Sequence, residues 1–335
     1  MKKPSFDKKL NENQTNISVL ITDGVHPKLV IGLEQLGFAC DYHPDISLSN
    51  VKSIIHQYDG VIINSKIIVD EDFLDKAVRL KFIGRLGSGM EIINQPYARK
   101  KGVAVFSAPE GNNNAVAEHA LGMLLAFANN FQKGDGEVRQ LIWDREANRG
   151  FEIMGKTIGI VGFGHTGSQF AKKLAGFGVS VLAYDKYKPE GYALDFGFVK
   201  ETTQKEIFEK ADIVSLHLPL NPETKHFANY AWMQQFKKPI VLINTSRGNV
   251  IPTDDLIKGL EKGIIQGACL DVFENEKPHT FSAEEKAVFN RLYEFKNVIL
   301  TPHVAGWTTE SLERLATVLL NKITSFLNET QPFQK

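Results

Sequence analysis

The chain has 335 residues, of which 43% are hydrophobic and 23% charged, and its 39 basic residues balance its 39 acidic residues. This length suits two domains, and the composition is that of an ordinary globular protein. The net charge of zero argues against nucleic acid and membrane surfaces as partners, because polyanion binders carry a basic excess. Cys40 and Cys269 lie far apart without metal-ligand spacing, so we expect neither a disulfide framework nor a bound metal.

Residues 1–16 are polar and lack the apolar segment of a signal peptide, so we predict a mobile tail there. No apolar run along the chain approaches the roughly 18–20 residues that span a bilayer. Together with the low cysteine content, these features predict a cytoplasmic protein in a reducing compartment.

Short apolar segments alternate with longer amphipathic segments along the rest of the chain. The predicted strands form two series. The first series covers residues 18–22, 38–42, 60–64, 81–86 and 103–107, with helices at 27–36 and 91–101. The second series covers residues 157–162, 180–185, 211–217, 239–244, 267–271 and 297–301. Nearly continuous apolar strands separated by helices are typical of parallel sheets covered on both faces. We therefore predict an α/β protein of two doubly wound parallel-sheet domains, Rossmann or flavodoxin-like, with a cofactor cleft between them.

The chain is expected to cross between these domains twice. Residues 108–131 begin with a polar Gly/Asn stretch and continue as a long apolar helix, which is a typical crossing segment. Residues 308–328 have the pattern of one further amphipathic helix. Because this helix is too short to form a domain, we expect it to return and complete the first one.

A glycine motif marks the expected cofactor site. Gly162, Gly164 and Gly167 follow an apolar strand and open a helix. In such a turn the first glycine permits the sharp bend, the second lets a pyrophosphate approach, and the third allows close helix–strand packing. The helix N-terminus offers free N–H groups to the anion. Asp185 ends the next strand, where a carboxylate binds ribose hydroxyls and repels a 2′-phosphate, so NAD is favoured over NADP.

Polar side chains follow several strands of the second series. These residues are Asp185, His217, Arg247, Asp271 and His303. The carboxyl ends of parallel strands meet at one edge of the sheet, where ligands of open α/β folds bind. The sequence therefore predicts a functional site at this edge.

Several motifs carry a resemblance to a known family. They are RLGSGMEIIN (85–94), GFGHTG (162–167), INTSRGNVI (243–251), DVFENEKP (271–278) and TPHVAGWT (301–308). In this order they resemble the signatures of the D-isomer-specific 2-hydroxyacid dehydrogenase family, most of all its phosphoglycerate dehydrogenase branch. The similarity runs from about residue 17 to residue 327. It implies an NAD-binding Rossmann domain over residues 110–303, inserted in a substrate-binding domain formed by residues 17–109 and 304–335.

The resemblance implies that Arg247, Glu276 and His303 form the catalytic set. A planar guanidinium such as that of Arg247 can bind the carboxylate and carbonyl oxygens of a 2-keto acid with two donors. His303 suits proton exchange with the alkoxide near neutral pH. Glu276, hydrogen-bonded to the other ring nitrogen, would favour the imidazolium.

The resemblance also implies where the ligands bind. Thr245 and Asp271 are expected beside the nicotinamide, and His217 and Pro219 along the cofactor cleft. The full predicted cofactor-binding set is Gly162, Gly164, His165, Thr166, Gly167, Asp185, His217, Pro219, Thr224, Thr245 and Asp271. The expected substrate contacts are Lys66, the backbone N–H groups of Ser88 and Gly89, and Arg247.

Two positions depart from the family pattern, and one of them bears on the substrate. Phosphoglycerate dehydrogenases usually carry an Arg-Ser pair after the third strand to receive phosphate, whereas Asn64 stands at the arginine position here and Lys66 could replace the charge. Glu91 replaces an aspartate that is usual in the family. The chain ends soon after its last predicted helix, so we do not expect the C-terminal serine-sensing domain of some phosphoglycerate dehydrogenases.

Three functions remain open at this point. The leading hypothesis is an NAD-dependent dehydrogenase acting on 3-phosphoglycerate, in serine biosynthesis. The alternatives are a glyoxylate or hydroxypyruvate reductase and an NADH-responsive binding protein similar to the family's corepressors. We expect a homodimer through the cofactor domain, with a contact on the helix that contains Leu121, Met123, Leu124 and Phe127. His119 on this helix is expected to pack at an interface rather than to act in catalysis.

Overall fold

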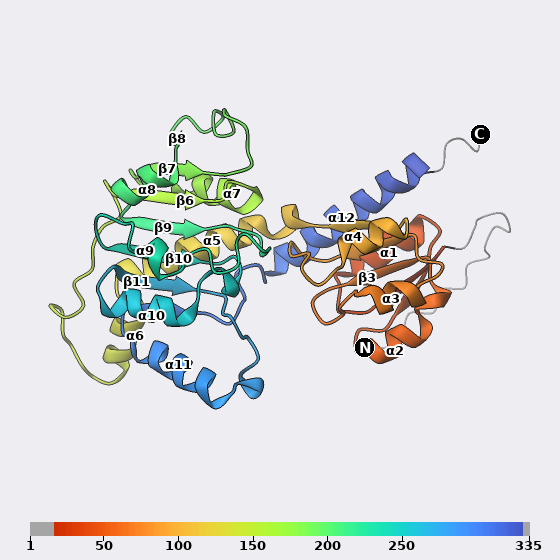
Figure 1. Cartoon of the computed structure of the whole chain (residues 1–335), viewed down its shortest axis with the longest axis horizontal. Coiled ribbons are helices and arrows are strands. Elements are labelled where there is room, and N and C mark those ends of the chain that lie inside the picture. The colour runs from red at the N-terminus through yellow and green to blue at the C-terminus, as the bar shows by residue number, and fades with distance from the viewer. Residues whose placement is uncertain (1–16, 331–335) are drawn as a thin grey trace. The chain divides into compact units, whose positions relative to one another are not determined.

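The computed structural model describes residues 17–330, so the mobile tail predicted for residues 1–16 lies outside the described residues. The chain divides into two compact units, and Figure 1 shows the helices and strands of each. Within the described residues, the smaller unit comprises 17–108 and 313–330, and the larger unit comprises 109–312. The chain therefore leaves the larger unit after residue 312, later than the predicted boundary at residues 303 and 304. The backbone N–H groups of Val304 and Ala305 bind Asp271, which holds this stretch in the larger unit.

The smaller unit is built on a five-stranded parallel sheet with the order β2-β1-β3-β4-β5. Its strands are β1 (Ser18–Ile21), β2 (Ala39–Tyr42), β3 (Gly60–Ile63), β4 (Phe82–Arg85) and β5 (Ala104–Ser107). Alternate side chains of the central strands enter two separate apolar cores. Leu20 and Val61 belong to one core, whereas Val19 and Ile62 belong to the other. The sheet is therefore buried on both faces, as the continuous apolar strands predict.

The helices of the smaller unit are α1 (Pro27–Gln35), α2 (Leu48–Ile54), α3 (Glu71–Lys76), α4 (Gln95–Lys100) and α12 (Thr309–Thr330), with a 3-10 turn η1 (Ile55–Gln57). Helix α4 begins later than the predicted start at residue 91. The side chain of Asn94 accepts a hydrogen bond from the N–H of Tyr97 at 3.1 Å and so caps the helix there. Helix α12 contributes Leu315 and Leu319 to the apolar core.

The larger unit is built on a seven-stranded sheet with the order β12-β11-β10-β9-β6-β7-β8, and all its strands are parallel. Its strands are β6 (Thr157–Val161), β7 (Ser180–Tyr184), β8 (Val199–Glu201), β9 (Ile213–Leu216), β10 (Ile240–Asn244), β11 (Ile265–Leu270) and β12 (Val298–Leu300). The order reverses direction beside β6, whose neighbours are β7 and β9. In such folds the ligand crevice lies outside the carboxyl ends of the strands at this point.

Helices cover both faces of the larger sheet, because alternate side chains of its strands again enter two separate apolar cores. Leu242 enters one core and Val241 the other. The helices are α5 (Pro109–Ala128), α6 (Phe131–Arg139), α7 (His165–Leu174), α8 (Gln204–Lys210), α9 (Tyr230–Met233), α10 (Thr253–Glu261) and α11 (Ala283–Glu294), with 3-10 turns η2 (Gly248–Val250) and η3 (Pro278–Thr280). The predicted fold class, two α/β domains on parallel sheets, is confirmed. None of the described helices is long and apolar enough to cross a membrane.

Candidate active site

The glycine turn after β6 has the geometry of a dinucleotide-binding turn. Gly162 has a φ of 91°, a conformation that other residues rarely adopt, and a Cβ there would lie 2.4 Å from the carbonyl oxygen of His217. A Cβ on Gly167 would lie 2.0 Å from the carbonyl oxygen of Gly162, whereas a Cβ on Gly164 would meet nothing within 4 Å. Gly162 and Gly167 are therefore required by the fold, and Gly164 borders open space.

Helix α7 begins at this open space. Its N-cap residue is Gly164, which has no side chain to cap the first turn. The N–H groups of the first turn, including those of His165 and Thr166, have no intrahelical acceptor and, with the helix dipole, favour an anion. The turn and the helix together form a cradle in which a pyrophosphate fits.

Asp185, directly after β7, is tied to the glycine turn. Its Oδ2 atom accepts a hydrogen bond from the N–H of Phe163 at 2.8 Å, and its Oδ1 atom accepts one from the N–H of Tyr187 at 3.0 Å. The neighbouring Lys186 is paired with Glu223 at 2.9 Å. The carboxylate thus remains beside the turn while the nearby ammonium group is neutralised by another residue.

Two buried polar atoms near the strand ends of the larger sheet have no hydrogen-bond partner within the described part of the chain. They are Nδ1 of His217 and Oγ1 of Thr245. His217 follows β9, its Nε2 lies 2.9 Å from Oγ of Ser215, and burial lowers its pKa to about 3. Because buried polar atoms are nearly always satisfied, these two indicate ligand contacts. Together with the glycine cradle and Asp185, they fit a dinucleotide.

Thr224 and Pro219 have a supporting position in the loop after β9. The Thr224 hydroxyl donates to the carbonyl oxygen of Pro219 at 2.5 Å, and it accepts from the N–H of Asn221 at 2.9 Å. Thr224 is buried. Its hydroxyl therefore closes the loop that carries both predicted cofactor-binding residues.

Arg247 follows β10 in a turn shaped by Asn244. The buried side chain of Asn244 accepts from the N–H of Ser246 at 3.0 Å and from its hydroxyl at 2.7 Å, and donates to the carbonyl oxygen of Arg247 at 3.0 Å. A Cβ on Gly248 would lie 1.9 Å from the carbonyl carbon of Phe273, so the Arg247 turn packs directly on the segment after β11. That segment carries Glu276.

Glu276 and His303 form a direct pair. Nδ1 of His303 lies 2.7 Å from Oε2 of Glu276, and the N–H of Phe273 donates to the other carboxylate oxygen at 3.2 Å. The two side chains are partly exposed, at 47% for His303 and 36% for Glu276. The pairing occupies Nδ1, so the proton that His303 can exchange with a ligand is on Nε2.

The pair shifts the pKa of both groups toward the ion pair. The hydrogen bond with Glu276 raises the pKa of His303 above its ordinary value, a shift that burial and the charge of Arg247 oppose. Burial alone would raise the pKa of Glu276, but the hydrogen bond and charge of His303, together with the N–H of Phe273 and Arg247, lower it overall. The pairing therefore favours the imidazolium and the carboxylate over the neutral forms of the two groups.

The buried carboxylate of Asp271 fixes the turn that presents His303. Asp271 accepts from the Thr301 hydroxyl at 2.6 Å and from the N–H groups of Val304 and Ala305 at 2.9 and 2.8 Å. His303 itself has a φ of 54°, which is uncommon for a residue other than glycine. The interactions on both sides hold it in this conformation.

His119, for which the sequence suggests a packing position at an interface, lies against the turn that presents His303. Its Nε2 atom lies 3.0 Å from Oγ1 of Thr301 and 3.6 Å from Oδ1 of Asp271. It therefore supports the His303 turn from helix α5. On the same helix, Met123 and Leu124 are buried in the core of the larger unit. They are not available for the subunit contact that we expected there, because the sheet of their own unit covers them.

In the smaller unit, a polar cluster occupies the carboxyl ends of β1, β3 and β4. Nη1 of Arg85 donates to Oδ1 of Asn64 at 2.8 Å, and the N–H of Asn64 donates to Asp23 at 2.9 Å. Nζ of Lys66 lies 4.0 Å from the Asp23 carboxylate and donates to the carbonyl oxygen of Pro44. Asn64 is thus a partner of an arginine on the neighbouring strand.

The glycine loop after β4 contains the other predicted substrate contacts. Gly87 has a φ of 150°, and a Cβ there would lie 2.3 Å from Nη1 of Arg85, so the guanidinium packs against the loop. Ser88 is exposed and Gly89 is buried.

Two residues of these sites were not among the predictions. Arg85 ends a strand of the first sheet, and the strand-end rule that identified Arg247 would have found it as well. Asn244 is the last residue of β10 and is buried. It reads as part of an apolar strand, and only the turn in three dimensions reveals its role.

Comparisons with known proteins show what the chain is similar to. Residues 121–305 match the family described as D-isomer specific 2-hydroxyacid dehydrogenase, NAD binding domain. The D-3-phosphoglycerate dehydrogenase of Methanocaldococcus jannaschii is 32% identical over 93% of this chain and 57% of its own length, and that of Bacillus subtilis is 35% identical over 84% of this chain and 51% of its own. The chain thus spans about half the length of these relatives.

Two further relatives match over most of their length. The hydroxypyruvate reductase of Thermotoga maritima is 31% identical over 88% of this chain and 92% of its own length. The crystal structure of D-lactate dehydrogenase from Aquifex aeolicus, complexed with NAD and lactic acid, superposes with a TM-score of 0.81 and 28% identity, over 93% of this chain and 96% of that one.

The His303–Glu276 pair leads to a prediction about pH. Glu276→Gln removes the carboxylate that raises the pKa of His303, so this pKa should fall toward the ordinary histidine value of 6.5. The folded state then loses the part of its stability that the raised pKa contributes, which is present at low pH and disappears as the pH rises through that pKa. NMR titration of the His303 ring protons checks the shift. An unchanged pKa in the variant would show that Glu276 does not control His303.

Proposed function

The chain belongs to the D-isomer-specific 2-hydroxyacid dehydrogenase family, and we propose that it interconverts a 2-hydroxy acid and the corresponding 2-keto acid with NAD. The observation that carries this proposal is the His303–Glu276 pair, with Nδ1 of the ring 2.7 Å from the carboxylate and Arg247 on the neighbouring strand end. A proton donor and a guanidinium close to an NAD-binding turn are the groups that this reaction requires.

Arg247, His303 and Glu276 have different roles in the proposed reaction. NAD, held by the glycine turn and Asp185, would supply the hydride acceptor for the hydroxy acid, and its reduced form would supply the hydride for the keto acid. Arg247 binds the carboxylate and the oxygen at C2 and orients them through its two donor nitrogens. In the reductive direction, Nε2 of His303 donates a proton to the developing alkoxide. In the oxidative direction the neutral ring removes that proton, and Glu276 stabilises the resulting imidazolium.

We propose that the substrate is 3-phosphoglycerate, oxidised in the direction of serine biosynthesis. The D-3-phosphoglycerate dehydrogenases among the relatives support this assignment. The N–H groups of Ser88 and Gly89 would bind the substrate carboxylate. Lys66 and Arg85 would supply positive charge for the phosphate.

Hydroxypyruvate is a second candidate, and the polar cluster of the smaller unit favours it. Nζ of Lys66 lies 4.0 Å from the carboxylate of Asp23, and Asn64 stands where phosphoglycerate dehydrogenases usually have arginine. A carboxylate beside the lysine disfavours a dianionic phosphate. The hydroxypyruvate reductase relative, which matches over 92% of its length, also supports this alternative.

Both candidates are tested by one assay. NADH oxidation is followed with 3-phosphohydroxypyruvate and with hydroxypyruvate, each at matched concentration, and kcat/KM is compared. Our proposal predicts a preference for the phosphorylated acid. His303→Ala should reduce turnover by roughly 10²- to 10⁴-fold, the usual contribution of a general acid, while NADH still binds.

A preference for hydroxypyruvate would contradict the 3-phosphoglycerate assignment and establish the second candidate. Lack of turnover with both, in a protein that still binds NADH, would instead favour the binding protein similar to corepressors. If His303→Ala abolished NADH binding as well as turnover, the role of His303 would be structural.

Asp185 is predicted to select NAD. Asp185→Ala should weaken NADH binding by about 10- to 100-fold, the effect of one or two charged hydrogen bonds. NADPH binding should weaken less or improve, because the repulsion of its 2′-phosphate is removed. Fluorescence titration with both cofactors measures these affinities.

Asp212→Ala provides a matched control. Asp212 accepts a hydrogen bond from the N–H of Thr157 at 2.8 Å, at the opposite end of β6 from the glycine turn. This variant should lose stability without losing NADH affinity. Equal losses of NADH and NADPH affinity in Asp185→Ala would mean that Asp185 acts only by supporting the turn.

We further propose that the protein is a homodimer through its cofactor domain. The supporting surface is α6 with the segment that follows it, where large apolar side chains are exposed in place of the buried Met123 and Leu124. They include Phe131, Val138, Leu141, Ile142 and Trp143. A cluster of this kind with a tryptophan is typical of a subunit contact, and a second copy of the chain would bury it by symmetry.

Sedimentation velocity at micromolar concentration tests the dimer. Trp143→Asp places a charge on a side chain that is 78% exposed and should shift the protein toward the monomer. Val78→Asp is the matched control, because Val78 is 76% exposed and belongs to the smaller unit. A monomeric wild-type protein, or equal effects of the two variants, would contradict this surface.

We also propose a cytoplasmic location. Both cysteines are free thiols, and Cys269 is buried beside the carbonyl oxygen of Met123. Unpaired cysteines are typical of a reducing compartment.

A further inference from the structure

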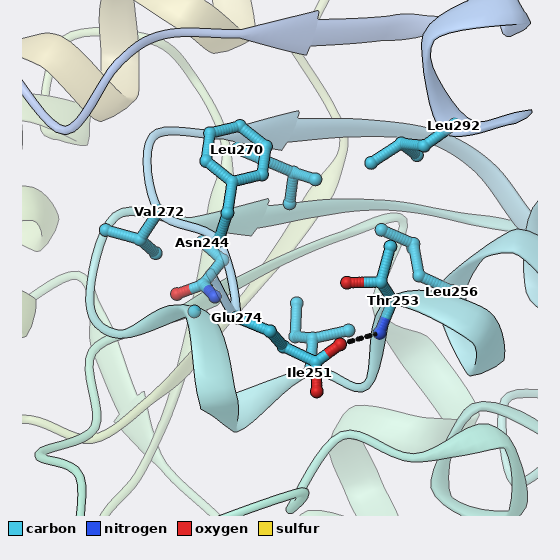
Figure 2. A pocket seen from close by; sticks show the side chains of 10 residues that line it. Asn244, Ile251, Thr253, Leu256, Leu270, Val272, Glu274 and Leu292 are labelled. Carbon is cyan, nitrogen blue, oxygen red and sulfur yellow. Dashed lines mark hydrogen bonds between the residues drawn. The ribbon is translucent and has the colours of Figure 1, made fainter. Parts of the chain in front are cut away.

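Two glutamates on the segment after β11 bind different parts of the larger unit. Glu276 pairs with His303, whereas Glu274 turns to the start of helix α10. Oε2 of Glu274 accepts a hydrogen bond from the N–H of Thr253 at 2.6 Å. Figure 2 shows this bond at the edge of a pocket lined by Ile251, Leu256 and other apolar side chains.

The first turn of helix α10 receives this carboxylate from outside the helix. The N-cap residue of the helix is Pro252, which makes no side-chain hydrogen bond to it. The N–H groups of a first helical turn need acceptors from outside the helix, and a negative charge there is favourable. Glu274 supplies both from a different segment of the chain, so the bond joins the segment after β11 to the helix after β10.

The same two segments are joined at two more points. Nδ2 of Asn249 donates to the carbonyl oxygen of Glu274 at 3.4 Å. Gly248 packs so closely on Phe273 that a Cβ would lie 1.9 Å from its carbonyl carbon. Arg247 immediately precedes this contact, and Glu276 follows it by a few residues. A displacement of the segment would therefore move Arg247 and Glu276 relative to each other.

His226 holds the carboxylate from its other side. Its ring Nε2 atom lies 3.4 Å from Oε1 of Glu274, and its backbone N–H donates to the carbonyl oxygen of Asn249 at 2.7 Å. His226 has a φ of 58°, a conformation that costs energy and needs support from its surroundings. Both carboxylate oxygens of Glu274 are thus engaged, each by a different element.

We propose that Glu274 is a positioning residue that holds Glu276 against His303 by tying the segment after β11 to the N-terminus of helix α10. The inference rests on the proposed function for the chemistry that the Arg247, Glu276 and His303 side chains perform. The positioning itself is a property of the folded chain and can be measured without turnover.

The test is an NMR titration of the His303 ring, whose resonances are assigned by comparison with His303→Asn. The charged groups around His303 are Glu276, Asp271 and Arg247, and their balance raises the pKa of His303 above 6.5 in the wild-type protein. Glu274→Ala changes none of these three side chains, but it releases the segment that carries Glu276. The pKa of His303 should therefore fall toward 6.5, and kcat should fall more than KM rises.

Two variants separate positioning from a general loss of stability. Glu274→Gln retains an acceptor for the N–H of Thr253 and should keep the pKa of His303 close to the wild-type value. Asp70→Ala removes a carboxylate that caps helix α3 in the smaller unit, where it accepts from the N–H of Phe73 at 2.8 Å. This control should lower the melting temperature and leave His303 unchanged.

A wild-type pKa of His303 in Glu274→Ala, or an equal fall in Asp70→Ala, would overturn the proposal. If Glu274→Ala does not fold, Thr253→Pro removes the same hydrogen bond from the donor side, and proline is well tolerated at the first helical position. It should lower the pKa of His303 in the same way, and an unchanged pKa would again overturn the proposal. A wild-type His303 with an ordinary pKa would instead argue against the Glu276 pair, and so against the proposed function.

Discussion

The geometry of the site depends on the fully buried carboxylate of Asp271. A buried carboxylate is tolerated only when hydrogen bonds replace the water it has lost, and Asp271 obtains them from Thr301, Val304 and Ala305. All three lie within two residues of His303. The requirement to satisfy Asp271 therefore imposes one path on the backbone, and His303 adopts a φ of 54° as a consequence. The orientation of the His303 ring follows from a solvation constraint on a neighbouring side chain.

A second constraint joins the other two functional side chains. Gly248 allows the turn after β10 to contact the backbone of Phe273, and any side chain at this position would separate them. Arg247 and Glu276 lie on either side of this contact, and Asn244 shapes the turn from within by accepting from Ser246. The carboxyl ends of β10, β11 and β12, which are neighbours in the sheet, thus carry three segments whose positions depend on one another. A parallel sheet provides this proximity for residues far apart in the chain.

The strands and the strand-end residues could be predicted from the sequence where their apolar pattern was long and regular. Long apolar strands and their order identified both sheets, whereas β8 was missed because its three residues, partly buried or exposed, lie at a sheet edge. Arg247, Asp271 and His303 were recognisable because each follows a strand of the same sheet. The contact of His119 with Thr301 was not, because an i to i+4 apolar pattern cannot show which polar side chain of a helix faces a loop from the far end of the chain. The burial of Met123 and Leu124 was misread for a related reason, since an apolar helix face reads the same whether its own sheet or a second subunit covers it.

Opposing influences set the protonation of His303. The hydrogen bond and charge of Glu276 and the charge of Asp271 raise its pKa, whereas partial burial and the charge of Arg247 lower it. In the proposed function Arg247 binds the anionic substrate, so its effect on His303 could not be removed without loss of binding. Without Glu276 the guanidinium would favour a neutral ring, which can accept a proton but is a much weaker acid toward an alkoxide than the imidazolium. With Glu276 the ring keeps its proton to a higher pH than an ordinary histidine and can still release it. A carboxylate on Nδ1, on the opposite side of the ring from Nε2, therefore compensates for the cation that the proposed substrate binding requires.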